Sequence, residues 1–249
     1  MPSTTAADAS LGGRTALVTG ASRGIGAAVV RALHGAGVQV VLLGRDMTAM
    51  TGLARELGQR GAPPPVAFAI DLASPDTVGA VLARVRSHLE AAPDIVVNSA
   101  GQFFLAPVEQ ISMEEFQRTL TVNLAAQFAI VREFLPDMRR RRRGHVVTIG
   151  SIADHRAFPG NAAYAASKYG VRGLHEVLRE ELRGSGVRAT LVSPGPVDTT
   201  LWDEVNPDER PGFTPRAQML DAAAVADAVR YVVTCPDEVN VDELRLSRA

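Results

Sequence analysis

A tyrosine and a lysine four residues apart are the side chains in this sequence best suited to proton transfer. They are Tyr164 and Lys168, in the stretch Tyr-Ala-Ala-Ser-Lys. On a helix, positions i and i+4 share a face, so the ammonium can lie beside the phenol hydroxyl. A nearby positive charge favours phenolate and lowers a tyrosine pKa from about 10 toward working pH. The pair therefore predicts a general acid/base at Tyr164.

The composition strengthens this interpretation. Of the 26 basic residues, 25 are arginine, and Lys168 is the only lysine. A chance pair on a solvated helix is the alternative, but arginine cannot release a proton or act as a compact point charge as lysine can, so this site has a physical reason to need lysine. Ser151 precedes the tyrosine by 13 residues and is the third candidate, although a lone serine there would be more simply explained as a turn cap.

Length and composition limit the protein class. A chain of 249 residues with 46% hydrophobic content can bury one substantial core, and a net charge of -1 gives no general attraction to nucleic acid or an anionic membrane. No apolar run approaches the roughly 18 residues of a membrane span. The single Cys235 excludes an internal disulfide, and the five histidines lack metal-ligand spacing, so no metal site is expected. We expect a cytoplasmic protein whose residues 1–13 form a flexible tail without a secretory signal.

Short β-branched runs alternate with helical stretches, which is typical of βαβ units and a parallel sheet covered on both faces. The pattern predicts one Rossmann-like, doubly wound α/β domain of three layers over residues 14–249. We expect strands at 15–19, 39–43, 66–70, 95–98, 145–149, 188–192 and 243–246. We expect helices at 25–36, 47–59, 75–89, 113–142, 162–183 and 222–234. The proline-rich segment 194–220 is expected to be a surface lid over the substrate rather than part of a sheet.

A glycine-rich turn follows the first predicted strand and opens a helix. Its sequence is Thr-Gly-Ala-Ser-Arg-Gly-Ile-Gly, from Thr19 to Gly26. Glycines there let the backbone approach a pyrophosphate, whose charge is met by the helix N-terminus. The spacing differs from GxGxxG, and the turn alone would also suit a tight strand-to-helix connection.

Together, the glycine turn and the tyrosine element resemble the short-chain dehydrogenase/reductase family from Thr19 to about Leu246. Asp71-Leu72, Asn98-Ser99-Ala100-Gly101 and Pro194-Gly195 resemble further family elements, with Ser99 at a position where the family usually has asparagine. The resemblance implies a catalytic set of Ser151, Tyr164, Lys168 and Asn123, the last holding a water beside the lysine. It implies cofactor contacts from Gly20, Ser22, Arg23, Gly24, Ile25, Gly26, Arg45, Asp71, Leu72, Asn98, Ala100, Gly101, Tyr164, Lys168, Pro194, Gly195, Val197 and Thr199.

The family resemblance implies hydride transfer between a nicotinamide and a carbonyl or secondary alcohol, with Tyr164 moving the proton. The second predicted strand ends at Gly44-Arg45, where an NAD enzyme would usually carry an acid. Arg45 and Arg23 suit a 2′-phosphate, although Asp46 weakens the field, so NADP(H) is the predicted cofactor. Phe103, His155, Phe158 and Trp202 are candidates for the wall of a substrate pocket.

Three questions stay open at the level of sequence. Arg139 to Arg143 form a run of cations at a predicted helix end, where a solvated terminus is the simpler explanation and a carrier-docking patch the sharper one. The C-terminus resembles the branch that includes 3-hydroxy acid and serine dehydrogenases and some antibiotic-pathway carbonyl reductases. This resemblance favours a small or medium carbonyl or alcohol substrate over the alternative of a 3-oxoacyl-carrier-protein reductase. A non-catalytic NADP(H)-binding sensor is the alternative of another class. Apolar positions on the helices beginning at Met113 and Ala162 resemble the family's dimer seam and suggest a homodimer or homotetramer.

Overall fold

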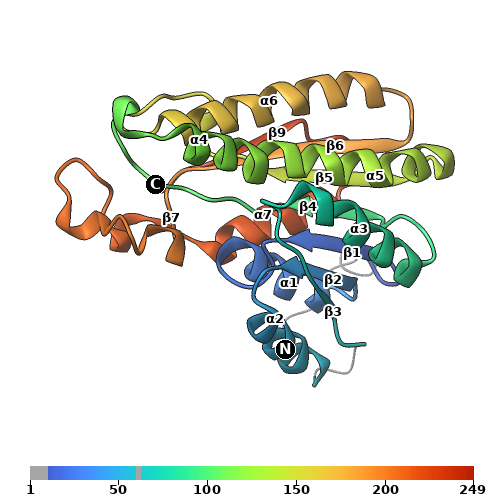
Figure 1. Ribbon diagram of the computed structural model, residues 1–249. Coiled ribbons are helices and arrows are strands. Elements are labelled where there is room, and N and C mark those ends of the chain that lie inside the picture. Colours follow the sequence, from blue (N-terminus) through green and yellow to red (C-terminus); the bar gives the residue numbers. More distant parts are fainter. Residues whose placement is uncertain (1–10, 60–62) are drawn as a thin grey trace.

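A computed structural model describes residues 11–59 and 63–249 (Figure 1). Its centre is a parallel sheet of seven strands in the order β3-β2-β1-β4-β5-β6-β9. The strands are β1 (Thr15–Thr19), β2 (Gln39–Gly44), β3 (Val66–Ala69), β4 (Ile95–Asn98), β5 (Gly144–Ile149), β6 (Val187–Pro194) and β9 (Glu243–Leu246). The predicted doubly wound α/β sheet is confirmed, with strand ends shifted by no more than two residues.

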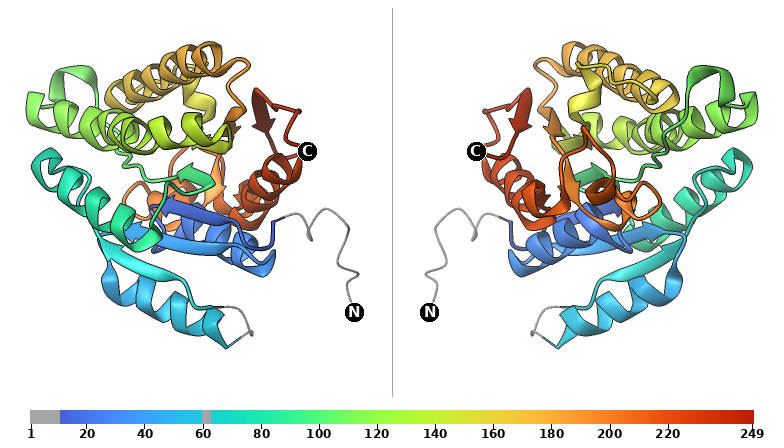
Figure 2. Two further views of the ribbon diagram at one scale, coloured as in Figure 1. Left: turned by 90° about the vertical axis from the view of Figure 1, so that its right-hand side faces the viewer. Right: turned by 90° about the vertical axis from the view of Figure 1, so that its left-hand side faces the viewer.

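Helices cover both faces of the sheet, which gives the three predicted layers. One face carries α1 (Gly24–Gly35), α2 (Met47–Gly58) and α7 (Ala222–Thr234). The other carries α3 (Pro75–Leu89), α4 (Met113–Leu120), α5 (Ala126–Arg141) and α6 (Ala162–Leu182). Figure 2 shows the sheet and the two helical layers from two opposite sides. None of the helices in the described ranges is long and apolar enough to cross a membrane.

The central strands are apolar at consecutive positions because both of their faces are buried. In β1, Val18 packs into the core on the α1 side, while its neighbour Leu17 packs into the core on the α5 side. Both side chains are fully buried. A strand of this kind lacks the alternation of a half-exposed strand, which is why continuous β-branched runs located the sheet in the sequence.

The single helix predicted over 113–142 is wrong in one respect, because a π-helical turn at Thr121–Ala125 separates α4 from α5. Ser112 starts α4 with a capping box that it shares with Glu115. The π turn contains Asn123, whose side chain bonds to the backbone of Gln102 and not within the helix. Such single π turns frequently occur at functional sites.

The segment predicted as a lid contains more regular structure than expected. It holds β7 (Val197–Asp198), which pairs in parallel with β8 (Leu220–Asp221), and three short 3-10 helices at Thr200–Trp202, Pro207–Glu209 and Arg216–Gln218. The expectation that this segment contains no sheet is therefore wrong at both of its ends, where β7 and β8 pair with each other. Between these ends the chain projects beyond the sheet beside the label β7 in Figure 1.

The packed chain begins earlier than the predicted boundary at residue 14. Leu11 is fully buried and belongs to the core on the α1 side, and its carbonyl accepts a hydrogen bond from the Arg14 N–H at 3.1 Å. A flexible tail extending to residue 13 is therefore wrong for Leu11. Residues 1–10, the rest of the predicted tail, lie outside the described residues.

Candidate active site

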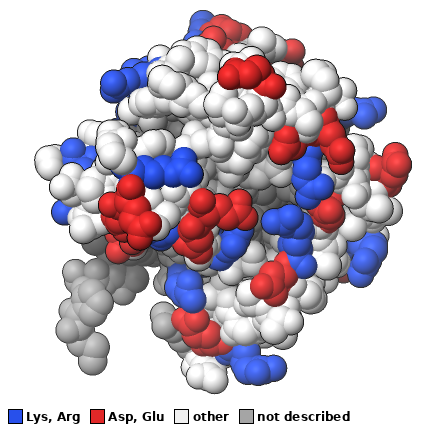
Figure 3. Space-filling view, turned by 60° about the vertical axis from the view of Figure 1, so that its left-hand side comes forward, with Lys and Arg blue, Asp and Glu red and all other residues white. Residues whose placement is uncertain are grey.

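A cavity of about 1020 Å³ opens at the carboxyl end of the sheet. Strands β2 and β4 flank β1, so the chain leaves β1 in one direction and returns on its other side. Doubly wound sheets bind ligands at such a switch point. The space-filling view of this side of the molecule shows a hollow whose rim carries charges of both signs (Figure 3).

Most of the residues predicted from the sequence line this cavity. They are Gly20, Ser22, Arg23, Gly24, Ile25, Gly26, Arg45, Asp71, Leu72, Ala100, Gly101, Phe103, Ser151, Phe158, Tyr164, Lys168, Pro194, Gly195, Val197, Thr199 and Trp202. They come from the ends of six strands, from α6 and the loop before it, and from the segment after β6. The fold thus brings together residues that are up to 182 positions apart, from Gly20 to Trp202.

Ser151, Tyr164 and Lys168 meet at the base of the cavity. Ser151 follows β5, and its hydroxyl caps the next turn by accepting the Ala153 N–H at 3.1 Å. Ser151 and Tyr164 both line the cavity, and the Ser151 side chain lies close enough to the phenol to act on its pKa. The Lys168 ammonium donates to the Ile149 carbonyl at 2.9 Å and lies 5.6 Å from the centroid of the Tyr164 ring. The helical spacing predicted this juxtaposition.

Burial shifts both titratable groups of the pair toward their neutral forms. Desolvation raises the pKa of Tyr164 to about 12, and the nearby Ser151 side chain opposes this only in part. Desolvation likewise lowers the pKa of Lys168 to about 8. The prediction that Lys168 lowers the pKa of the phenol is therefore wrong in this structure. Tyr164 is instead held as a protonated hydroxyl, the form that can donate a proton.

Asn123 is fully buried in the π turn and lies outside the cavity lining. Its Oδ1 accepts the Gln102 N–H at 2.8 Å, while its Nδ2 donates to the Gln102 carbonyl and the Ser167 hydroxyl, each at 3.0 Å. The amide thus joins the loop after β4 to α6, beside Lys168. Among the described residues its side chain makes no hydrogen bond to Lys168 or Tyr164, and its bonds hold this loop in position.

The glycine turn forms a close backbone cradle at the other end of the cavity. A Cβ on Gly26 would lie 2.2 Å from the Gly20 carbonyl oxygen, and a Cβ on Gly20 would lie 2.9 Å from the Ala100 Cα. Only glycine fits such contacts. Arg23 is the N-cap of α1 without a side-chain capping bond, which leaves the N–H groups of the first turn facing the cavity. Such a helix start attracts phosphate.

Charged residues beyond this cradle lie at the ends of β2 and β3. Arg45 and Asp46 line the cavity there, together with Asp71. The Asp46 carboxylate caps α2 by accepting the Ala49 N–H at 2.9 Å, and the Asp71 carboxylate accepts the Ala73 N–H at 3.0 Å. Both acids are engaged with backbone, while Arg45 is exposed with no ion pair among the described residues.

Two predicted site residues lie away from the cavity besides Asn123. Asn98 is fully buried behind it, and neither side-chain atom has a hydrogen-bond partner among the described residues. The prediction that His155 lines the substrate pocket is wrong: its Nδ1 lies 2.7 Å from the Asp154 carboxylate, and the residue is exposed outside the lining. The preceding residue, Asp154, holds the ring outside the cavity lining.

Asp154, which was not among the residues predicted from the sequence, has its carboxylate fully buried below Ser151. It accepts the Ser151 N–H at 3.2 Å and the Ser193 hydroxyl, and it forms an ion pair at 3.0 Å with Arg172, which also pairs with Glu243 of β9 at 2.7 Å. Burial would raise the pKa of this carboxyl, but bonds from Ser193, His155, Ser151 and Arg172 hold the pKa below its ordinary value. The capping spacing Ser-x-x-Asp was the available signal.

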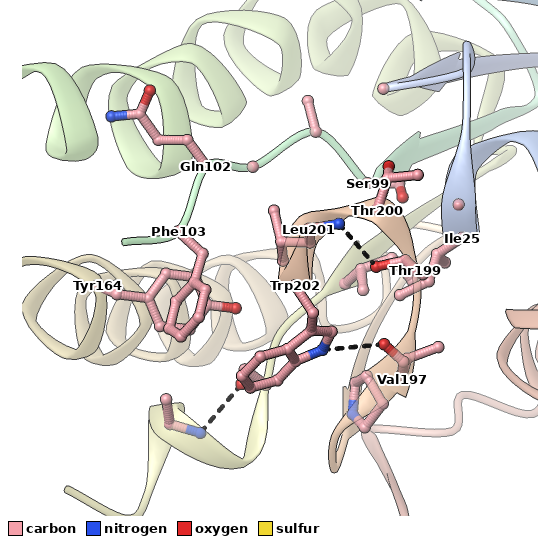
Figure 4. Close-up of a pocket in the computed structure, with 18 of the residues that line it drawn as sticks. Ile25, Ser99, Gln102, Phe103, Tyr164, Val197, Thr199, Thr200, Leu201 and Trp202 are labelled. Carbon is pink, nitrogen blue, oxygen red and sulfur yellow. Dashed lines mark hydrogen bonds between the residues drawn. The ribbon is translucent and has the colours of Figure 1, made fainter. Parts of the chain in front are cut away.

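Apolar residues that were not predicted from the sequence also line the cavity between the loop after β4 and the segment after β6. Leu105, Val122, Ile152, Leu201 and Phe213 all belong to the lining. Phe213 and Leu201 lie in the proline-rich segment, where a large apolar side chain among polar neighbours signals a buried contact. Figure 4 shows Phe103, Tyr164, Leu201 and Trp202 gathered around this end of the cavity.

Comparison with known proteins agrees with this architecture. A model of the short chain dehydrogenase family matches residues 14–210. An uncharacterised oxidoreductase of Staphylococcus aureus strain MW2 is 32% identical over 231 residues, which cover 93% of this chain and 95% of the relative.

Two solved structures superpose over nearly the full length. A metagenomic short-chain oxidoreductase in complex with NADP is 32% identical, with a TM-score of 0.82 and coverage of 96% of this chain and 99% of the other. An alcohol dehydrogenase from the archaeon Thermococcus sibiricus, complexed with 5-hydroxy-NADP, is 29% identical, with a TM-score of 0.84 and coverage of 95% and 97%. The chain with the paired Tyr164 and Lys168 thus belongs to the short-chain dehydrogenase/reductase family of oxidoreductases.

Proposed function

We propose that the protein is an NADP(H)-dependent oxidoreductase that interconverts a carbonyl group and a secondary alcohol, with Tyr164 as general acid/base. The observation that carries the proposal is that Tyr164 lies beside Ser151 and Lys168 in the cavity lining, at the junction of the glycine cradle and an apolar chamber. A panel of ketones, aldehydes and alcohols, followed by the absorbance of reduced nicotinamide, tests it.

The residues present fit a dinucleotide. The contact between Gly26 and the Gly20 carbonyl leaves no room for a side chain, and the uncapped start of α1 offers N–H donors to a pyrophosphate. Asp71 and Leu72 would flank the adenine, Arg45 and Arg23 a 2′-phosphate. Lys168 would bond the nicotinamide ribose, and Pro194 to Thr199 would flank the carboxamide, as in the family that the chain resembles.

The bound nicotinamide supplies or accepts the hydride. Ser151 and Tyr164 hold the carbonyl oxygen with two O–H donors, which stabilise charge that develops on that oxygen in the transition state. Tyr164, with its pKa of about 12, then donates its proton to the oxygen. Lys168 offers a positive charge next to the phenolate that forms, and Asn123 keeps the neighbouring loop in place.

Arg45 gives a direct test of the preference for NADP(H). A charge-assisted hydrogen bond contributes about 1.5–3 kcal/mol, so Arg45→Ala should raise the KM for NADPH about ten- to a hundredfold and leave that for NADH nearly unchanged. Arg55→Ala is the matched control, since Arg55 is exposed on α2 outside the cavity lining. Equal effects of Arg45→Ala on both nucleotides would show that Arg45 does not read the 2′-phosphate.

The opposite variant would place an acid at position 44, where NAD enzymes usually carry one, but the structure leaves little room for it. A Cβ on Gly44 would lie 3.1 Å from the Met50 Sδ, so Gly44→Asp requires Met50 to shift. Arg45→Ala is therefore the cleaner variant for nucleotide preference.

The arginine run gives the test that separates this proposal from a carrier-dependent reductase. Each arginine of the run has a partner within the fold. Arg139 pairs with Glu181 and Arg143 with Asp94, while Arg142 donates to the Gly184 carbonyl. Arg140 and Arg141 also have partners. The partners Asp94 and Gly184 lie just before the first residues of β4 and β6. These contacts are therefore at the end of the sheet opposite the cavity. The run stabilises the fold at that end, and a docking role is not required to explain it.

Arg140→Ser combined with Arg142→Asn should therefore leave kcat/KM for a free ketone within about twofold. Asparagine is chosen because Arg142 has φ of 51°, a conformation that asparagine tolerates. Kinetics on a free ketone and on the same acyl group attached to a carrier protein, at two salt concentrations, make the comparison. A salt-sensitive loss confined to the carrier substrate would favour the 3-oxoacyl-carrier-protein reductase instead.

We also infer a homodimer or homotetramer. Large apolar side chains are exposed on adjacent helices, namely Met113 on α4, Phe128 on α5, and Tyr169 and Val177 on α6. A second copy would cover them, and light scattering measures the assembly. A cytoplasmic location remains a prediction from the sequence.

A further inference from the structure

The two ends of the cavity differ in charge. Arg23, Arg45, Asp46 and Asp71 line the end that holds the glycine cradle. Past Tyr164 and Lys168, the lining contributed by the described residues contains no further Asp, Glu, Lys or Arg. Its few polar groups are neutral amides and hydroxyls such as those of Gln102, Asn161 and Thr214. A substrate that occupies this chamber therefore finds no counterion beyond Lys168.

Aromatic rings build the wall of the uncharged chamber. Phe103 lies between Tyr164 and Trp202, with ring centroids 4.9 and 5.1 Å apart and edge-to-face geometry in both pairs. Phe213 continues the row, 6.5 Å from Trp202. The indole N–H of Trp202 donates to the Val197 carbonyl at 3.1 Å, so its polar atom is satisfied and its ring remains available to a ligand (Figure 4).

We propose that the chamber selects an uncharged carbonyl compound with an aryl or bulky alkyl group, and that it discriminates against carboxylate- and phosphate-bearing substrates. The inference rests on the proposed reductase function. Aromatic walls make favourable contacts with an apolar or aromatic group of the substrate, whereas an anion would lose its hydration without gaining a partner.

One cation lies just outside the chamber and needs a control. The guanidinium of Arg156 lies 5.1 Å from the centroid of the Phe158 ring, and Phe158 lines the cavity whereas Arg156 does not. If Arg156 received a substrate carboxylate, Arg156→Ala would remove activity on anionic substrates selectively. Under the proposal this variant changes the ratio of neutral to anionic substrate activity by less than about threefold.

The test compares methyl benzoylformate with benzoylformate, which share the ring and the keto group and differ by a carboxylate. With NADPH saturating, we expect kcat/KM to be at least about 100-fold higher for the ester, because a buried charge without a partner is costly. Acetophenone, which lacks the acid and the ester, should also exceed benzoylformate. An equal or higher kcat/KM for benzoylformate would overturn the inference.

Two variants address the aromatic wall itself. Trp202→Leu and Phe103→Leu should each lower kcat/KM for the aryl ketones by about tenfold or more, while NADPH binding and the reduction of butanone change much less. Tyr231→Leu is the control, because this aromatic residue is exposed on α7 outside the cavity lining. Uniform losses across aryl ketones and butanone in a well-folded variant would contradict a selecting role.

The outcomes separate the inference from the function on which it rests. Turnover that favours anionic ketones refutes only the substrate class. Absence of turnover with every ketone, aldehyde and alcohol, in a protein that binds NADPH, refutes the proposed reductase and the inference together.

Discussion

Tyr164→Phe is expected to lower kcat for carbonyl reduction by at least about 10²–10⁴-fold, the range typical of lost acid/base catalysis. The substitution keeps the ring that packs against Phe103 at 4.9 Å but removes the hydroxyl that would donate the proton. The affinity for NADPH should stay nearly unchanged. Steady-state kinetics with an aryl ketone and a fluorescence titration with NADPH measure the two quantities separately.

Tyr169→Phe supplies the matched control. Tyr169 also lies on α6, immediately after Lys168, but its side chain is exposed and outside the cavity lining. It should retain full turnover. If Tyr164→Phe kept most of the activity of the unaltered protein, another group would have to donate the proton and the assignment of Tyr164 would be wrong.

Asp154→Ala is expected to have the largest effect on stability, lowering the free energy of unfolding by about 3 kcal/mol. Removing one partner of a buried ion pair costs roughly 3–5 kcal/mol, and Arg172 retains Glu243, which favours the lower value. The change also removes the acceptor of the Ser151 N–H and the Ser193 hydroxyl. Urea unfolding at neutral pH measures the loss.

Asp203→Ala is the control for this effect, because Asp203 forms an exposed ion pair with Arg216. Exposed pairs contribute about 0–1 kcal/mol, so this variant should unfold almost like the unaltered protein. If Asp154→Ala cost no more than Asp203→Ala, the buried network would not stabilise the turn that carries Ser151.

The Asp154 carboxyl should also make the free energy of unfolding depend on pH in the acid range. The pKa of Asp154 in the folded protein lies below its ordinary value, so the unfolded chain binds this proton more readily. The contribution of Asp154 to the free energy of unfolding is complete at pH values above the ordinary aspartate pKa of about 4. It is lost as the pH falls through the pKa that Asp154 has in the folded protein. The difference in stability between the unaltered protein and Asp154→Ala should therefore shrink as the pH decreases below about 4.

The sheet was predictable because both faces of its central strands are buried. Adjacent residues such as Leu17 and Val18 enter different cores, so apolar runs rather than alternation mark the strands. Tyr164 and Lys168 were also predictable, since their proximity depends only on helical spacing. These features are local in sequence.

The features that the sequence did not reveal depend on contacts across the fold. The π turn follows from Asn123 binding Gln102, 21 residues away, within an otherwise continuous helical pattern. The direction of the Tyr164 pKa shift depends on burial, which the spacing of two residues cannot give. His155 faces outward because Asp154 is drawn inward by Arg172 and Ser193. Leu11 packs against a core formed by residues far along the chain.

The most direct measurement is kcat/KM of the unaltered protein for NADPH and for NADH, with methyl benzoylformate as the carbonyl substrate. The account predicts turnover that requires Tyr164 and a preference for NADPH of about tenfold or more. Binding of NADPH without turnover of any carbonyl or alcohol would contradict it and favour a nucleotide sensor. Turnover with a preference for NADH would retain the reductase and contradict the role given to Arg45.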